Sequence, residues 1–99
     1  MIRHVVMFRW SEARAEDELQ RLGAALDALP GLIPGVVSYQ HGRDLGLADT
    51  NYDYAVTGVF ADAAALAVYR DHEAHQRFLA DHIVGRTADR VAVQFDVDG

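Results

Sequence analysis

Four segments of the chain combine β-branched or aromatic residues with the alternation that is typical of β-strands. In residues 52–60, for example, Tyr54, Val56 and Phe60 fall on one face, and Ala55 and Thr57 fall on the other. The segments predicted as strands are residues 2–10, 33–43, 52–60 and 91–97. Residues 44–51, DLGLADTN, are rich in Gly, Asp, Thr and Asn and are predicted to form a loop.

The pattern between the first two strands is helical, because leucines recur there every three or four residues. They are Leu19, Leu22, Leu26 and Leu29. Ser11 is the predicted N-cap, and the acidic residues that follow it suit the positive end of a helix dipole. The pair Pro30-Gly31 is predicted to end this helix.

A second helical region follows the third strand in two pieces. Asp62 is a predicted N-cap for a short helix over residues 63–70. Asp71 is a predicted N-cap for another piece, which runs from about residue 72 to residue 84 and ends near Gly85.

The resulting order, β-α-β-β-α-β, is that of a ferredoxin-like α+β fold, here as one domain over residues 1–99. Helices on one face of such a sheet leave the other face open. Both sides of the first strand are apolar in the middle, so the open face still carries aromatic or aliphatic residues. An open apolar sheet face is normally buried by a partner, so we expect a homodimer whose two sheets form an α/β barrel.

Charge and composition exclude several classes of function. The chain has 99 residues and a formal charge of −6, and no basic block appears, so neither nucleic acid nor a membrane is an expected partner. There is no cysteine to form a disulfide or act as a thiolate. The N-terminus is too short and too charged for a signal peptide, so we expect a cytoplasmic protein. No nucleotide-binding or serine-hydrolase motif occurs.

Five stretches carry a resemblance to a known family: MIRHVVMFRW, LPGLIPGVVSYQHGRDLG, NYDYAVTGVFAD, YRDHEAHQRF and RVAVQFDV. Together they resemble the stress-responsive dimeric A/B barrel (Dabb) family over essentially the whole chain. The resemblance implies a dimeric α+β barrel. The family includes plant stress proteins and a plant polyketide cyclase, which forms olivetolic acid by an intramolecular aldol condensation without metal or organic cofactor.

The resemblance to that cyclase also implies site residues. Its catalytic tyrosine and histidine fall on Tyr69 and His75, and a pocket histidine falls on His4. Two positions depart from the pattern: Tyr54 stands where the cyclase has a pocket histidine, and Glu73 stands where the family usually has proline. These departures leave the acid–base pair in place but put the same substrate in doubt.

An aldol-type cyclisation needs a base next to a carbonyl and a donor to the oxyanion, and we assign these roles to His75 and Tyr69. In one straight helix these two side chains would point about 120° apart. They converge only if the helix breaks between them, which a cap at Asp71 allows. The alternative is that both residues pack at the edge of the core with their polar tips in water.

The remaining candidates have simpler interpretations beside the functional ones. His72, His75 and His82 could hold a metal, but the usual helical zinc motif spaces its histidines four apart, so we expect neither metal nor cofactor. Phe8, Trp10 and Tyr54 are predicted pocket walls. His4 is either a pocket residue or a core residue.

Other polar side chains are expected at the surface. His41 is predicted to be exposed at the end of the second strand, Arg70 to pair with acidic residues at the surface, and Arg90 to be solvated.

Three classes of function therefore compete. The chain binds a small hydrophobic metabolite, or it is a cofactor-free cyclase or lyase of a polyketide-like or carbonyl-rich aromatic compound, or it is a structural protein whose dimers assemble further. A cofactor-independent oxygenase rests on analogy of fold alone.

Overall fold

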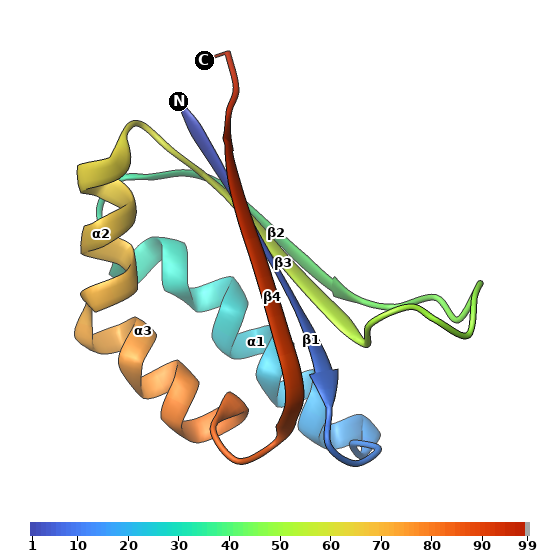
Figure 1. Cartoon of the computed structure of the whole chain (residues 1–99). Helices are drawn as coiled ribbons and strands as arrows, with labels where there is room; N and C mark the ends of the chain where they lie inside the picture. The colour runs from blue at the N-terminus through green and yellow to red at the C-terminus, as the bar shows by residue number, and fades with distance from the viewer. Residues whose placement is uncertain (99) are drawn as a thin grey trace.

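The computed structural model describes residues 1–98, and it shows a four-stranded antiparallel sheet with helices on one face (Figure 1). The strands lie in the order β2-β3-β1-β4. The elements are β1 (Ile2–Trp10), α1 (Glu16–Leu32), β2 (Val36–Arg43), β3 (Tyr54–Phe60), α2 (Ala63–Asp71), α3 (Glu73–Phe78), the π-helical turn η1 (Leu79–Ile83) and β4 (Thr87–Asp96). This is the predicted ferredoxin-like α+β fold.

The register of the sheet decides which side chains face the helices. Phe8 on β1 pairs with Tyr54 on β3 and with Arg90 on β4, so these three side chains share the helix-covered face. The core forms between this face and the helices. Its most deeply buried side chains are Leu22, Leu26, Ile33 and Phe60.

Helix α1 differs from its predicted bounds at both ends. It begins at Glu16 with Ala15 at the N-cap position, because the Ser11 N–H bonds to the Arg86 carbonyl and holds that residue at the end of the sheet. It continues through Pro30 to Leu32. Proline removes one N–H donor, but the Ile33 N–H still bonds to the Leu29 carbonyl, and the buried Ile33 side chain anchors the end.

The second helical region is broken, as predicted, but a different residue makes the new cap. Asp62 caps α2 through a 2.9 Å bond from the Ala65 N–H. At His72 the chain turns extended, with φ −62° and ψ 141°. His72 Nδ1, and not the Asp71 carboxylate, accepts the bond from the Ala74 N–H at 3.0 Å. The π-helical turn then leads to Gly85, whose φ of 80° suits glycine and turns the chain into β4.

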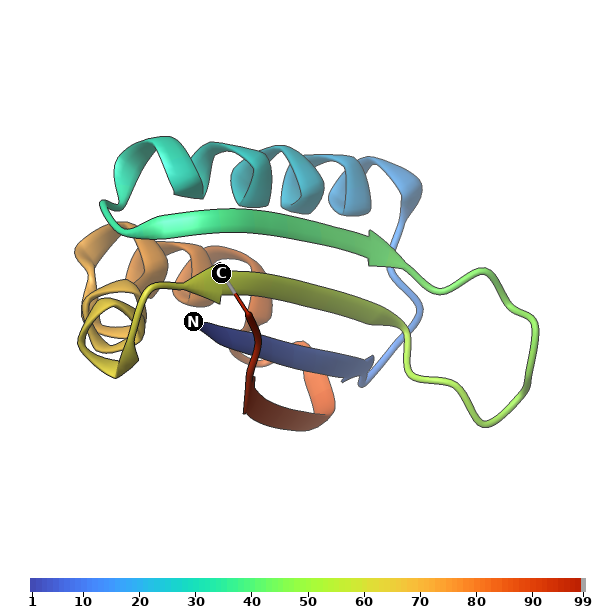
Figure 2. The same cartoon turned by 90° about the horizontal axis from the view of Figure 1, so that it is seen from above.

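The face of the sheet away from the helices is apolar and open. Met7 on β1 is 39% exposed, and Val93 and Phe95 on β4 are 55% and 49% exposed. The loop between β2 and β3 projects beyond the sheet (Figure 2), and its Leu45 and Leu47 are each 83% exposed. Within residues 1–98, no helix is both long and apolar enough to cross a membrane.

Candidate functional site

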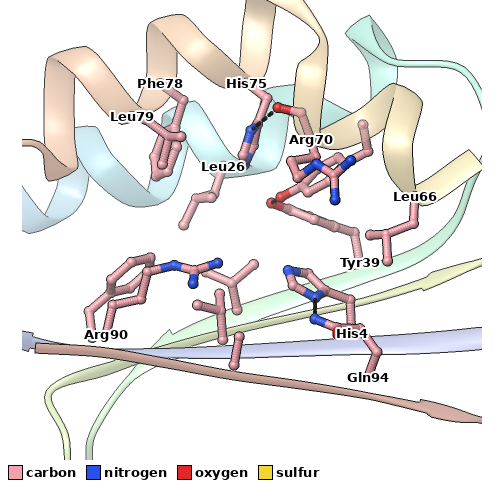
Figure 3. A pocket seen from close by; sticks show the side chains of 15 residues that line it. His4, Leu26, Tyr39, Leu66, Arg70, His75, Phe78, Leu79, Arg90 and Gln94 are labelled. Carbon is pink, nitrogen blue, oxygen red and sulfur yellow. Dashed lines mark hydrogen bonds between the residues drawn. The ribbon is translucent and has the colours of Figure 1, made fainter. Parts of the chain in front are cut away.

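A cavity of about 300 Å³ lies between the sheet and the helices α2 and α3 (Figure 3). Its volume is at the lower end of the range for small-molecule sites. Seven larger apolar side chains form most of its wall, namely Val6, Phe8, Leu26, Val56, Leu66, Phe78 and Leu79. The polar side chains that line it are His4, Tyr39, Tyr69, Arg70, His75, Arg90 and Gln94. A mostly apolar wall with a few polar groups is the usual design of a ligand site.

The break at His72 brings Tyr69 and His75 together. Tyr69 is in the last turn of α2 and His75 is in the first turns of α3, so each belongs to a different helix axis. Their ring centroids are 4.4 Å apart at a tilt of 45°. The two side chains therefore converge on one cavity instead of diverging as they would along a straight helix.

The hydrogen bond of His75 to the backbone fixes which ring nitrogen carries the proton. Nδ1 lies 3.0 Å from the Arg70 carbonyl oxygen (Figure 3). A carbonyl can only accept, so Nδ1 donates and Nε2 of the neutral ring is unprotonated. Burial lowers the pKa of His75, and the positive charge of Arg90 lowers it further, while the bond to Arg70 raises it. The ring is therefore neutral near pH 7 and able to accept a proton.

His4 carries the opposite tautomer. The amide nitrogen of Gln94, which can only donate, lies 2.8 Å from His4 Nδ1 (Figure 3). Nδ1 therefore accepts, and the proton of the neutral ring is on Nε2. Burial lowers the pKa of His4, and the positive charge of Arg90 lowers it further. The cavity thus contains one imidazole that can accept a proton and one that can donate a hydrogen bond.

Two phenols complete the polar lining. The hydroxyls of Tyr39 and Tyr69 are 2.6 Å apart. Burial raises the pKa of both tyrosines, so both stay protonated near pH 7. Either hydroxyl can be the donor of this bond. When Tyr39 donates, the Tyr69 hydrogen is free to bond with a ligand.

Four polar residues of the cavity, Tyr39, Arg70, Arg90 and Gln94, were not predicted from the sequence. Tyr39 reaches the cavity from β2, and Arg90 and Gln94 reach it from β4. Arg90 is exposed, as predicted, but it also lines the cavity, which was not predicted. The alternation of residues 91–97 is a signal that could have identified Arg90. Extended back by one position, it places Arg90 on the same face of the strand as Ala92 and Gln94. Arg70 pairs with the acidic Asp71 at the surface, as predicted, and it also lines the cavity from the last turn of α2.

Two predicted wall residues, Tyr54 and Trp10, lie outside the lining of this cavity. The Tyr54 hydroxyl is held 2.7 Å from His41 Nδ1. Trp10 stacks on Phe8 with centroids 5.8 Å apart, and the Arg14 guanidinium covers its ring. Of the predicted wall residues, His4 and Phe8 do line the cavity.

His41 is the one histidine whose predicted exposure is wrong. Its side chain is only 13% exposed, because it is held between two partners. Nε2 lies 2.5 Å from the Asp27 carboxylate on α1, and Nδ1 bonds to Tyr54. This chain of bonds joins α1 to the sheet away from the cavity.

The histidines of the HEAH stretch are engaged with the backbone. His72 Nδ1 caps α3, and His75 Nδ1 donates to Arg70. In the part of the chain that the structure describes, no three His, Asp or Glu side chains are grouped as metal ligands.

Comparisons with known proteins agree with this architecture. A crystal structure of a dimeric ferredoxin-like protein of unknown function from Thermobifida fusca is 42% identical, with a TM-score of 0.88 over 97% of this chain and 90% of that one. A Dabb family protein from Mesorhizobium loti is 26% identical, with a TM-score of 0.80 over 99% and 97% of the two chains. An uncharacterised protein of Streptomyces coelicolor is 33% identical over 81% of this chain and 84% of its own length.

The fold also occurs in an enzyme of more distant sequence. A hydroxynitrile lyase from Passiflora edulis superposes with a TM-score of 0.81 over 98% of this chain and 93% of that one. At 17% identity, this likeness is one of fold. Residues 2–97 match the stress responsive A/B barrel domain. The chain therefore belongs to the stress responsive A/B barrel (Dabb) domain family.

Proposed function

We propose that this chain binds a small, mostly apolar carbonyl compound in the cavity and removes a proton from it without a metal or an organic cofactor. His75 is the base and Tyr69 is the donor to the oxyanion. The observation that carries the proposal is the hydrogen bond from His75 Nδ1 to the Arg70 carbonyl. It leaves Nε2 unprotonated on a ring that lies 4.4 Å from that of Tyr69.

The reaction begins when Nε2 of His75 takes a proton from the carbon next to the carbonyl group. The electron pair of the C–H bond moves to the carbonyl oxygen, and the resulting enolate accepts a hydrogen bond from Tyr69. In a cyclisation, the enolate carbon then attacks a second carbonyl of the same molecule. The alkoxide so formed takes the proton back from His75, which restores the enzyme.

A lyase reaction would use the same groups to break a C–C bond instead of forming one. The base removes a hydroxyl proton, the carbonyl forms, and the adjacent C–C bond breaks to release a carbanion that takes a proton in its turn. His75, which holds the proton taken from the hydroxyl, returns it to the carbanion and becomes neutral again, while the neutral ring of His4 can donate a hydrogen bond from Nε2 to the departing group. The hydroxynitrile lyase of Passiflora edulis has this fold, so the cleavage of a hydroxynitrile is one reaction of this kind to examine.

The test of this proposal is the exchange of the methyl protons of acetophenone for deuterium in D₂O, followed by ¹H NMR. This probe reports proton removal next to a carbonyl and needs no knowledge of the natural substrate. We expect the wild-type chain to accelerate exchange. His75→Gln should lower the protein-dependent rate by about 10²–10⁴-fold, and Tyr69→Phe should lower it by about 10²–10³-fold.

His82→Gln is the matched control, because His82 is part-buried but lies outside the cavity. It should keep the wild-type rate. A second candidate function, binding without chemistry, rests on the apolar wall of the cavity. It predicts that acetophenone shifts the NMR signals of His4 and His75 while no exchange occurs, and that result would overturn the catalytic proposal.

We also propose that the protein is a homodimer joined through the open face of its sheet. The exposed apolar residues on β1 and β4 support this, as do the structural relatives that are described as dimeric.

Val93→Asp should weaken the dimer, since Val93 pairs with Val5 near the middle of that face. Val84→Asp is the control, since Val84 is also exposed but lies in the turn before β4. A monomeric wild-type mass by light scattering at micromolar concentration would contradict the dimer.

A further inference from the structure

The charged lining of the cavity has one sign. Arg70 and Arg90 both line it, and no aspartate or glutamate of residues 1–98 does. This balance is the reverse of that of the whole chain, which has fifteen acidic residues against nine basic ones. The cavity is therefore a cationic site in an acidic protein.

Arg90 is the more available of the two cations. Arg70 lies 3.4 Å from the Asp71 carboxylate. Arg90 takes part in none of the ion pairs found between the described residues. The neighbouring Asp89 carboxylate instead accepts bonds from the Tyr52 hydroxyl and from the main-chain N–H of Arg90.

The position of Arg90 directs its charge into the cavity. Its backbone pairs with Phe8, so its side chain is on the helix-covered face of the sheet. In Figure 3 the guanidinium points from the sheet toward the space between His4 and the helices. Burial is the main influence on the pKa of His4, His75 and Tyr69, and the positive charge of Arg90 lowers all three.

We propose that the compound bound in this cavity carries a carboxylate and that Arg90 is the partner that anchors it. This inference rests on the proposed function and narrows its substrate to a small apolar carboxylic acid that also has a carbonyl group. The planar guanidinium can bond both oxygens of a carboxylate at once. One free guanidinium in a cavity of about 300 Å³ suits a single charge on a small molecule.

Anchoring at Arg90 also orients the ligand. Arg90 is on the sheet side, whereas Tyr69 and His75 are on the helix side of the cavity. A carboxylate held at β4 therefore leaves the rest of the molecule to extend along the apolar wall toward His75 Nε2. Arg90 is in this way a binding residue that selects the substrate, while the proton transfer remains with His75 and Tyr69.

The test compares two ligands of equal shape, phenylacetate and the neutral phenylacetamide, by NMR titration of the wild-type protein. We expect phenylacetate to bind about ten- to a hundredfold more tightly, as a charge-assisted hydrogen bond predicts. Arg90→Gln should remove this preference. Arg86→Gln should keep it, because Arg86 lies outside the cavity and bonds to the Asp81 carbonyl.

The outcomes separate this inference from the proposed function. If both ligands bind equally and shift the signals of His4 and His75, the carboxylate preference is overturned and the ligand cavity stands. If the preference depends on Arg90 but acetophenone shows no exchange, the inference holds and the catalytic role falls. If neither ligand shifts these histidine signals, the inference is overturned together with the cavity as a binding site.

Discussion

Tyr39 can reach the cavity because the residue opposite it on β3 has no side chain. Tyr39 pairs with Gly58 across β2 and β3. A Cβ atom added at Gly58 would lie 3.1 Å from Tyr39 Cδ1 and 3.1 Å from Phe60 Cε2. These distances are too short for an unstrained contact, and the rings that would have to move are packed against Tyr69. Gly58 therefore keeps open the space that the tyrosine pair needs.

Gly58→Ala should lower the free energy of unfolding by about 1–3 kcal/mol, the usual effect of overpacking a core. Urea denaturation of both proteins at one concentration measures it. Gly42→Ala is the matched control, since Gly42 is on β2 and a Cβ there would meet nothing within 4 Å. Equal stability of the two variants would show that Gly58 has no such role.

At this same scale, the sequence predicted some site residues and missed others for a physical reason. Tyr69 and His75 could be predicted because the resemblance to the plant cyclase places its catalytic tyrosine and histidine on these two positions of one short segment. Tyr39 and Arg90 join the site through strand pairing, which depends on register between segments that are distant in sequence. Tyr54 was predicted to line the cavity, but its hydroxyl bonds to His41 instead. That bond joins two strands, so the local sequence pattern does not predict it.

Among the elements, the joint between α2 and α3 determines the site. A helix that continued through His72 would keep Tyr69 and His75 about 120° apart. The extended backbone of His72 redirects the chain, and its Nδ1 atom satisfies the Ala74 N–H at the start of α3. The cap therefore stabilises the break that brings the two rings together.

His72→Ala should cost about 1 kcal/mol of stability, as the loss of a helix cap does. It should also separate the Tyr69 and His75 rings and so lower the rate of acetophenone exchange. Asp71→Ala is the matched control, because Asp71 is the adjacent polar residue and its side chain does not cap α3. If Asp71→Ala had the larger effect on both stability and exchange, the assignment of the cap to His72 would be wrong.

Element order was predictable because it depends on local alternation and leucine spacing, which the structure confirms. Element ends were less predictable because they depend on distant partners. Ser11 is a good N-cap by composition, yet its backbone bonds to Arg86 and α1 starts later. Strand β4 starts at Thr87, before its alternating valines, since β1 extends far enough to pair with it there.

For the molecule as a whole, buried neutral histidines make stability depend on pH. Burial lowers the pKa of His4, His75 and His82 in the folded state. In the unfolded chain an imidazole has a pKa of about 6.5, so the unfolded state takes up protons first as the pH falls. The free energy of unfolding should therefore be fully retained above this pKa and should fall as the pH drops toward the folded values.

Urea denaturation at about pH 7.5 and about pH 5 measures this loss. His75→Gln should lose less stability between the two conditions than the wild type, because it has one fewer buried imidazole to protonate. An identical loss in both proteins would mean that His75 is no harder to protonate in the folded state than in the unfolded chain.

The pH profile of acetophenone exchange reports whether His75, neutral and with Nε2 free, is the base in the cavity. Because burial lowers the pKa of His75, we expect a protein-dependent rate that rises with pH and levels off above an inflection below about pH 6.5. His75→Gln should lose this inflection. A rate that keeps rising in proportion to hydroxide, and that is the same with and without His75, would contradict this role of His75.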